Sequence, residues 1–313
     1  MITTVTMNAS IDKAYYMSQA IENGTVMRVK TCLNSAGGKG LNVARIARLC
    51  GASVQATGLV GGYNGQYLEA LLDRDNIPHN FLHIQGETRS CINILDEKYG
   101  STEYLEPGCE VTAEEEQAFM EKFPDIIRDS SVVTISGSIP KGVKADIYGR
   151  LISIAKTMGK QVILDSSGET LREGIRCCPT IVKPNQDEIQ QFFHEKIHGM
   201  EETITCAKRI YDLGIPYVVI SLGKEGALLV CREGVYLGRP PKVQVINTVG
   251  CGDSMVGGLA VSLERGDTPE KALGHAVAVA TANALSPNTG DFKKEQYEKL
   301  IRQVSVDRLM SVS

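Results

Sequence analysis

The sequence predicts an α/β fold: a three-layer αβα sandwich with a mostly parallel central sheet and a small β-sheet lid. Short apolar runs rich in β-branched residues recur along the chain, and segments with helical periodicity lie between most of them. Strands that alternate with helices pair mainly in parallel, and the helices then cover both faces of the sheet. Two strand-like stretches interrupt this alternation and predict the lid.

The elements of the sandwich follow one another in a regular order. The first strand is expected at residues 2–7, and a glycine-rich turn precedes the first helix at residues 41–49. Further strands are expected at residues 54–60, 132–136, 162–165, 180–183, 218–222 and 227–231. Further helices are expected at residues 66–74, 113–123, 145–157, 204–213, 255–265 and 269–285.

The lid is expected from residues 13–34 and 88–106, which resemble hairpins outside the main sheet. These stretches flank the turn at Gly37 in the sequence, so they could form one small sheet over the same cleft. No internal repeat, low-complexity tract or linker divides the chain. Residues 1–313 are therefore predicted to form a single domain with this lid as an appendage.

The composition argues against several classes of function. Lys and Arg are scattered among acidic residues and the net charge is −4, so no nucleic-acid partner is expected. No apolar run approaches the roughly 18 residues of a membrane span, and the N-terminus lacks the features of a signal peptide. A cytoplasmic protein without a membrane partner is expected. The nine cysteines lack paired zinc-type spacing and are expected to be reduced thiols.

The turn at residues 247–254 (NTVGCGDS) carries the strongest chemical signal. Gly250, Cys251 and Gly252 place free backbone amides at the start of a helix, where the helix dipole favours an anion such as a phosphoryl group. Asp253 lies in the first turn of that helix, close enough to take a proton from a hydroxyl that attacks the bound group. The alternative is that Asp253 only caps the helix.

A second glycine cluster at residues 35–42 (SAGGKGLN) also opens a helix. Gly37 and Gly38, with the cation of Lys39 and the carboxamide of Asn42, could clamp a hydroxylated, phosphorylated substrate. No Walker A loop is present, because no Gly-Lys pair is followed by the Ser or Thr that this loop requires. No dinucleotide fingerprint is present either, because its third glycine is missing. Lys39 alone could equally be a solvated residue at a helix start.

Three charged residues lie where a ligand could bind. Asp12 follows the first strand, so its carboxylate could accept hydrogen bonds from sugar hydroxyls at the carboxyl end of the sheet. Arg28 and Arg89 lie on the two lid stretches, and an Arg side chain matches phosphate geometry bidentately. Taken singly, each of the three could be a solvated surface residue.

Two further turns follow predicted strands. Asn185 and Glu188 have the spacing of a capping box, and the alternative is that both arrange Mg²⁺ and its water shell near nucleotide phosphates. The turn at residues 221–226 (SLGKEG) either lies beside those phosphates or is a simple hairpin. Residues 194–198 (HEKIH) match the zinc-protease pattern, but Gly199 follows at once and predicts a frayed helix end.

Together these residues resemble the PfkB branch of the ribokinase-like kinases, from residue 6 to about residue 291. The family's opening T-L-N-P-x-x-D is similar to residues 6–12 (TMNASID), and its first signature is intact at residues 37–44 (GGKGLNVA). Its second signature, D-T-V-G-A-G-D, stands at residues 247–253 as NTVGCGD, where Cys251 replaces a small residue whose backbone amide matters. The resemblance implies a ribokinase-like fold and ATP-dependent phosphotransfer to an alcohol group of a sugar phosphate.

The resemblance also implies roles by position. Asp253 becomes the general base, and the amides of residues 250–253 become the anion hole. The sugar phosphate is expected among Asp12, Arg28, Gly37, Gly38, Lys39, Asn42, Arg89 and Ser138. ATP is expected among Lys183, Asn185, Ser221, Gly223, Lys224, Gly226 and Asn283, with Mg²⁺ held through water near Glu188. Some relatives hold a monovalent cation, which here points to K⁺ near Asn247, Val249, Asn288 and Gly290, and the family lid implies a homodimer.

Within the branch, the lid stretches at residues 86–95 (GETRSCINIL) and 103–108 (EYLEPG) resemble those of the tagatose-6-phosphate kinases. This implies conversion of D-tagatose 6-phosphate to D-tagatose 1,6-bisphosphate, with fructose 6-phosphate as a further substrate. 1-Phosphofructokinases, which act on fructose 1-phosphate, usually have T-R-x-N-x-K where this chain has Cys91 and Asn93. An inactive sugar-phosphate sensor is the alternative outside the enzymes, and the intact Asp253 and glycine turn argue against it.

Overall fold

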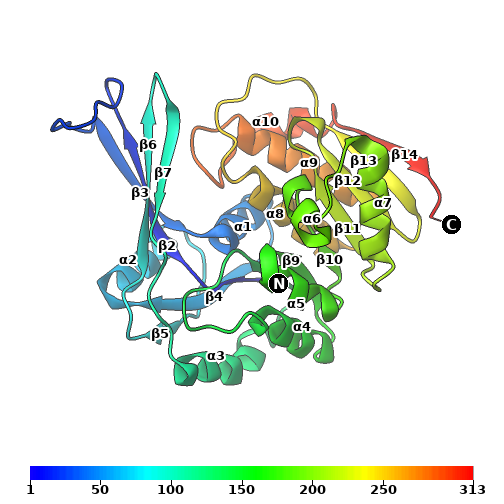
Figure 1. Ribbon diagram of the computed structural model, residues 1–313, viewed down its shortest axis with the longest axis horizontal. Coiled ribbons are helices and arrows are strands. Elements are labelled where there is room, and N and C mark those ends of the chain that lie inside the picture. Colours follow the sequence, from blue (N-terminus) through cyan, green and yellow to red (C-terminus); the bar gives the residue numbers. More distant parts are fainter. Residues whose placement is uncertain (313) are drawn as a thin grey trace.

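The computed structural model describes residues 1–312, which form two β-sheets surrounded by helices (Figure 1). The strands of the large sheet are β1 (Ile2–Thr6), β4 (Val54–Gly61), β5 (Leu82–Ile84), β8 (Val132–Ser136), β9 (Gln161–Asp165), β10 (Ile181–Val182), β11 (Tyr217–Ser221), β12 (Ala227–Cys231), β13 (Gly234–Arg239) and β14 (Ser305–Met310). Their order is β14-β13-β12-β11-β10-β9-β8-β1-β4-β5. The sheet is parallel from β5 to β11 and antiparallel from β11 to β14, which confirms the mostly parallel sheet.

Helices cover both faces of the large sheet, so the three-layer arrangement is also confirmed (Figure 1). The helices are α1 (Lys39–Leu49), α2 (Gly62–Arg74), α3 (Ala113–Ile126), α4 (Ile147–Thr157), α5 (Gly168–Arg176), α6 (Gln186–Phe193), α7 (Gly199–Tyr211), α8 (Cys251–Arg265), α9 (Pro269–Ala284) and α10 (Lys294–Leu300). Neighbouring residues of a strand point to opposite faces. Val132 accordingly packs in a core with α1, α2, α8 and α9, whereas Val133 packs in a second core with α3, α4, α5 and α7.

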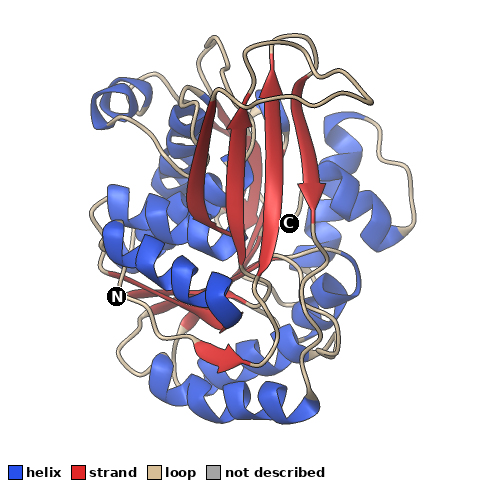
Figure 2. Cartoon of the chain, turned by 90° about the vertical axis from the view of Figure 1, so that its left-hand side faces the viewer, coloured by secondary structure: helices blue, strands red, loops and turns tan. Residues whose placement is uncertain are grey.

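The second sheet has four strands and is called the lid sheet here, after its position over the cleft. Its strands are β2 (Ser10–Tyr16), β3 (Thr31–Gly37), β6 (Arg89–Asp96) and β7 (Gly100–Leu105), in the order β3-β2-β6-β7. Figure 2 shows this sheet face on, with no helix over the face toward the viewer. Large apolar side chains are exposed on the lid strands: Tyr104 on the face away from the cleft, and Leu33 and Leu105 on the face that lines the cleft.

The sequence predicted most of these elements and misplaced some of their ends. The lid strands reach from Ser10 to Gly37, beyond the expected residues 13–34, so Asp12 lies within β2 and not in a loop after β1. The strand expected at residues 180–183 shortens to β10, because Pro184 has no N–H to donate to a neighbouring strand. The strands β5, β13 and β14 and the helices α5 and α10 were not predicted.

The zinc-protease pattern does not lie on one helix. The helix α6 ends at Phe193, and His194 adopts the left-handed conformation with φ of 56°. His198 precedes the first residue of α7, so the two histidines belong to different elements. No cluster of His, Cys, Asp or Glu able to hold a metal is found among residues 1–312, and no helix there is long and apolar enough to cross a membrane.

Candidate active site

A cleft of about 1290 Å³ lies between the lid sheet and the carboxyl ends of the parallel strands. A carboxyl edge of a parallel sheet is the usual place for a ligand. The chain brings together here most of the residues predicted for the two substrates and the reacting groups. The predicted residues that line the cleft are Asp12, Gly38, Lys39, Asn42, Arg89, Ser138, Lys183, Asn185, Glu188, Ser221, Gly250, Gly252 and Asp253.

The glycine turn begins helix α8 at the floor of this cleft. Gly250 is the N-terminal cap and has φ of 76°, a left-handed conformation that favours glycine. A Cβ atom at this position would lie 2.5 Å from Cγ2 of Thr289, so a side chain would displace the adjoining loop. Because α8 starts at Cys251, the amides of Gly252 and Asp253 have no partner within the helix and are available to an anion, whereas the amide of Cys251 donates to the carbonyl of Thr248 at 3.3 Å.

Asp253 lies in this first turn and is 7% exposed. Its Oδ2 accepts a hydrogen bond of 2.7 Å from Nδ2 of Asn42, and the side chain does not cap α8, so the capping interpretation is wrong. Burial and the nearby charge of Asp165 raise the pKa of Asp253 to about 6, against the opposing effects of Lys39 and Asn42. A carboxylate whose pKa lies near neutrality is well matched to the work of a general base.

Asp165 is a buried acid that the sequence analysis did not identify. It ends β9 and is 1% exposed, and its Oδ1 lies 3.3 Å from Nζ of Lys183 and 3.7 Å from Nζ of Lys39. Neither of its carboxylate oxygens receives a hydrogen bond from residues 1–312. The charge of Asp165 raises the pKa of Lys39, so this lysine is a firm cation in the cleft. Its position at the end of a predicted strand was the available signal.

The sugar side of the cleft is formed by the lid sheet. Asp12 accepts a 2.7 Å hydrogen bond from Oγ of Ser10, and burial raises its pKa. Gly37 lies outside the cleft lining and makes room for that carboxylate, because a Cβ there would be 1.9 Å from Oδ1 of Asp12. Arg89 donates to the carbonyls of Glu106 and Asn8, each at 2.9 Å, while its Nε has no partner within residues 1–312.

The opposite side of the cleft contains the turn at Asn185. Oδ1 of Asn185 accepts from the amide of Glu188, and Oε2 of Glu188 accepts from the amide of Asn185, both at 2.8 Å. The capping box is therefore present, and both residues also line the cleft. The turn at residues 221–226 contains the short helix η1 (Gly223–Glu225) and joins β11 to β12 as a hairpin.

Several predicted residues do not line the cleft. Arg28 is exposed in the loop between β2 and β3, and the side chain of Asn283 is turned inward. Nδ2 of Asn283 donates to the carbonyl of Val249 at 3.0 Å, and Oδ1 accepts from the amide of Gly290 at 2.9 Å. Asn283 therefore holds the glycine turn against the loop that follows α9. The other predicted residues outside the lining are Gly223, Lys224, Gly226 and Cys251.

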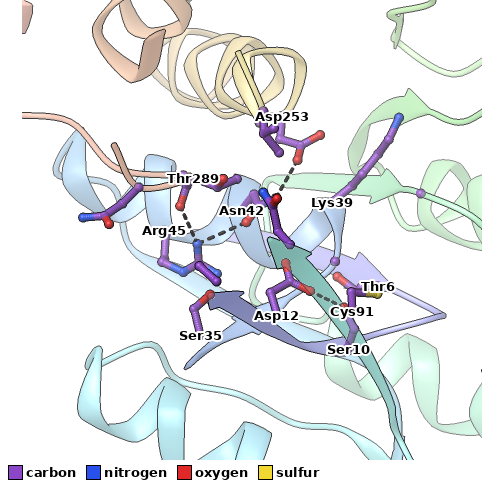
Figure 3. A pocket seen from close by; sticks show the side chains of 18 of the residues that line it. Thr6, Ser10, Asp12, Ser35, Lys39, Asn42, Arg45, Cys91, Asp253 and Thr289 are labelled. Atoms are coloured by element: carbon purple, nitrogen blue, oxygen red, sulfur yellow. Dashed lines mark hydrogen bonds between the residues drawn. The ribbon is translucent and has the colours of Figure 1, made fainter. Parts of the chain in front are cut away.

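Figure 3 shows Asp253 and Asn42 pointing toward each other, with Arg45 beside Asn42 and hydrogen-bonded to it. Arg45 was not identified from the sequence either, because an Arg on an amphipathic helix gives no signal of its own.

Comparisons with known proteins agree with this geometry. The model of the pfkB family carbohydrate kinases matches residues 5–296. The chain is 36% identical over 309 residues to a tagatose-6-phosphate kinase of Staphylococcus epidermidis (strain RP62A), covering 98% of this chain and 99% of the relative.

Solved structures give the same result. Phosphofructokinase-2 from Escherichia coli in complex with potassium is 31% identical with a TM-score of 0.91, over 96% of this chain and 98% of that one. A possible 1-phosphofructokinase from Thermotoga maritima is 26% identical with a TM-score of 0.84, over 99% of each chain. The chain therefore belongs to the pfkB family of carbohydrate kinases and is an ATP-dependent sugar-phosphate kinase.

Proposed function

We propose that this kinase transfers the γ-phosphoryl group of ATP to the free primary hydroxyl of D-tagatose 6-phosphate, and that it also accepts fructose 6-phosphate. The observation that carries the proposal is the position of Asp253: a buried carboxylate with a raised pKa, beside a free helix N-terminus and facing Lys39 across the cleft. The 36% identity to a tagatose-6-phosphate kinase supports the choice of sugar.

Each part of the reaction has a residue suited to it. Asp253 takes the proton of the attacking hydroxyl, and the amides at residues 250–253 hold the transferring group. Lys39, at the start of α1, neutralises developing charge. Arg89 and Asp12 bind the phosphate and a hydroxyl of the sugar, while the lid sheet closes over the cleft and excludes water. Arg28 and Asn283 have no assigned contact in this scheme.

The cleft also suits the cations of such a kinase. Carboxylate oxygens are the ligands that Mg²⁺ prefers, and Glu188 and Asp165, which is ion-paired with Lys183 and Lys39, both line the cleft. Bound Mg²⁺ would neutralise phosphate charge. For K⁺ we propose the loop beside the glycine turn, at Asn247, Val249, Asn288 and Gly290; these residues lie together in the cleft lining, and a relative was crystallised with potassium.

The exposed apolar side chains of the lid sheet suit contact with a second copy of the chain. Tyr104 is 60% exposed on the face away from the cleft, while Leu33 and Leu105 are 48% and 64% exposed on the cleft side, and burying these side chains would remove apolar surface from water. We propose a homodimer that forms through this sheet in the cytoplasm.

The test is ADP release with Mg·ATP from tagatose 6-phosphate, fructose 6-phosphate, fructose 1-phosphate and unphosphorylated sugars, compared by kcat/KM. A preference for the 6-phosphates supports the proposal. A preference for fructose 1-phosphate would keep the mechanism and change the substrate to that of a 1-phosphofructokinase. Binding without turnover on any sugar phosphate would favour the sensor.

A further inference from the structure

Arg45 lies one helical turn after Asn42 on α1, and its guanidinium is occupied by other parts of the protein. Nη1 donates to Oδ1 of Asn42 and to the carbonyl of Thr289, each at 3.1 Å, and Nη2 donates to the carbonyl of Ala36. Asn42 in turn donates to Asp253 at 2.7 Å. Figure 3 shows this chain of contacts from Thr289 through Arg45 and Asn42 to Asp253.

The orientation of the Asn42 carboxamide decides what Asp253 meets. An amide nitrogen facing Asp253 stabilises the carboxylate, whereas an amide oxygen would repel it. A guanidinium has donors and no acceptor, so only the oxygen of Asn42 can accept from it, and the nitrogen of Asn42 must then face Asp253. We infer that Arg45 is a positioning residue that fixes Asn42 in the orientation that supports the ionised base. This inference rests on the proposed role of Asp253 in the kinase reaction.

Arg45 also connects the segments that surround the base. The carbonyl of Ala36 belongs to β3 of the lid sheet, and Thr289 belongs to the loop that packs on Gly250. A Cβ atom on Gly290 would lie 2.8 Å from Nη1 of Arg45, so this loop sits directly on the guanidinium. Arg45 therefore joins the lid sheet, the carboxamide partner of the base and the loop beside the glycine turn.

Other charged groups also act on Asp253 and Arg45, and their effects have to be distinguished from the effect of Asn42. Asp253 faces Asp165, Lys39 and Lys183, and these charges stay in place when Arg45 is replaced. Arg45 itself faces several carboxylates, namely Asp12, Asp75, Asp253 and Asp291. Loss of the Arg45 charge would therefore act on Asp253 through space as well as through Asn42, and the experiment must distinguish the two routes.

The experiment is the pH profile of kcat at saturating Mg·ATP and sugar phosphate for Arg45→Met, Arg45→Lys, Asn42→Ala and the double variant Asn42→Ala/Arg45→Met. Wild type is expected to lose activity as the pH falls through about 6, where Asp253 becomes protonated. Arg45→Met should move this midpoint up by about one pH unit and lower kcat about tenfold, with both KM values within about twofold. Arg45→Lys keeps the charge but not the two-pronged donor, and it should show most of the same shift.

The double variant identifies the route. If Arg45 acts through Asn42, replacing it in the Asn42→Ala background should add little further shift. An equal shift in both backgrounds, or an unchanged midpoint in Arg45→Met, would overturn the inference. Arg265→Met is the matched control, because Arg265 ties α8 to the carbonyl of Cys50 after α1 at 3.0 Å, and it should leave the midpoint unchanged. If Arg45→Met does not fold, Arg45→Lys can be compared in the same way in the wild-type and Asn42→Ala backgrounds.

A measurement without turnover separates this inference from the proposed function. An inactive wild type would count against the kinase assignment alone. The side-chain NH₂ signal of Asn42, followed by NMR with ¹⁵N-labelled asparagine and assigned with Asn42→Ala, should then titrate with Asp253. The titration midpoint should be higher in Arg45→Met. The same titration in both proteins would overturn the positioning role.

Discussion

The glycine turn and the lid sheet face each other across one cleft, but the protein holds them in different ways. The turn is tied to α9 by Asn283, is covered by the loop at Thr289, and presents a buried Asp253 bonded to Asn42. The lid sheet is contacted by α2 and leaves apolar side chains such as Leu105 exposed. This difference indicates that the groups around Asp253 are preorganised, and we propose that the lid sheet is the more mobile wall and the one that selects the sugar.

Removing the base should give the largest effect on the turn side. Asp253→Asn keeps the shape and the contact with Asn42 but cannot accept the proton, so kcat should fall by about 10³-fold or more. Binding of ATP and sugar phosphate, measured by calorimetry, should stay within about threefold of wild type. Asp307→Asn, an exposed carboxylate on β14, is the control. A kcat within about tenfold of wild type would remove Asp253 from the role of base.

Disturbing the turn itself should cost less. Gly250→Ala forces a side chain into a left-handed residue and against Thr289, which moves the amides of the anion hole, so kcat should fall about 10²-fold. Gly266→Ala is the matched control, because Gly266 also has positive φ, of 70°, but has open space around it. Equal activities of the two variants would contradict the role of the Gly250 turn in holding the transferring group.

A change on the lid should affect binding more than the chemical step. Arg89→Ala removes a cation from the sugar side and releases the carbonyls of Glu106 and Asn8, so KM for the sugar phosphate should rise about 10-fold or more. KM for ATP and kcat should change little. Lys98→Ala, at the tip of the lid sheet, is the control. A loss confined to kcat would contradict the division between the two walls.

The smallest expected effect is on stability. Because the pKa of Asp253 is raised from 3.8 to about 6 in the folded protein, its protonated form contributes stability below pH 3.8 that is lost as the pH rises through about 6. Asp253→Asn does not ionise, so it should be more stable than wild type at pH 8, by at most about 3 kcal/mol. This gain should vanish near pH 3.5 in chemical denaturation. A less stable variant at pH 8 would contradict the burial account.

How far the sequence predicts the site differs between its parts. Lys39 and Asp253 stand in motifs whose glycines open helices, so their place in the cleft followed from local chemistry. Asp165 and Arg45 lie in an ordinary strand end and an ordinary helix, and only the fold brings them to Lys183 and Thr289. The role of Asn283 could not be predicted from the sequence either, because its hydrogen bonds to the glycine turn depend on how α9 packs.

The fold shows the same division. The buried parallel strand β8 is rich in β-branched apolar residues, and both of its ends were predicted to the residue, while the ends of β1, β4, β9 and β11 were predicted to within one residue. The edge strand β14 is mostly exposed and has no apolar run, and its pairing with β13 depends on the distant register Leu237–Asp307. The parallel pairing of β2 with β6 is likewise a tertiary feature without a local signal.

Phosphoryl transfer to the sugar phosphate can be tested by ³¹P NMR of a mixture of wild-type enzyme, Mg·ATP and tagatose 6-phosphate. We expect ADP together with one new phosphate ester whose phosphorus couples to methylene protons, in equal amounts. ADP with inorganic phosphate and no new ester, or an unchanged mixture, would contradict the assignment of phosphoryl transfer to a primary hydroxyl at Asp253.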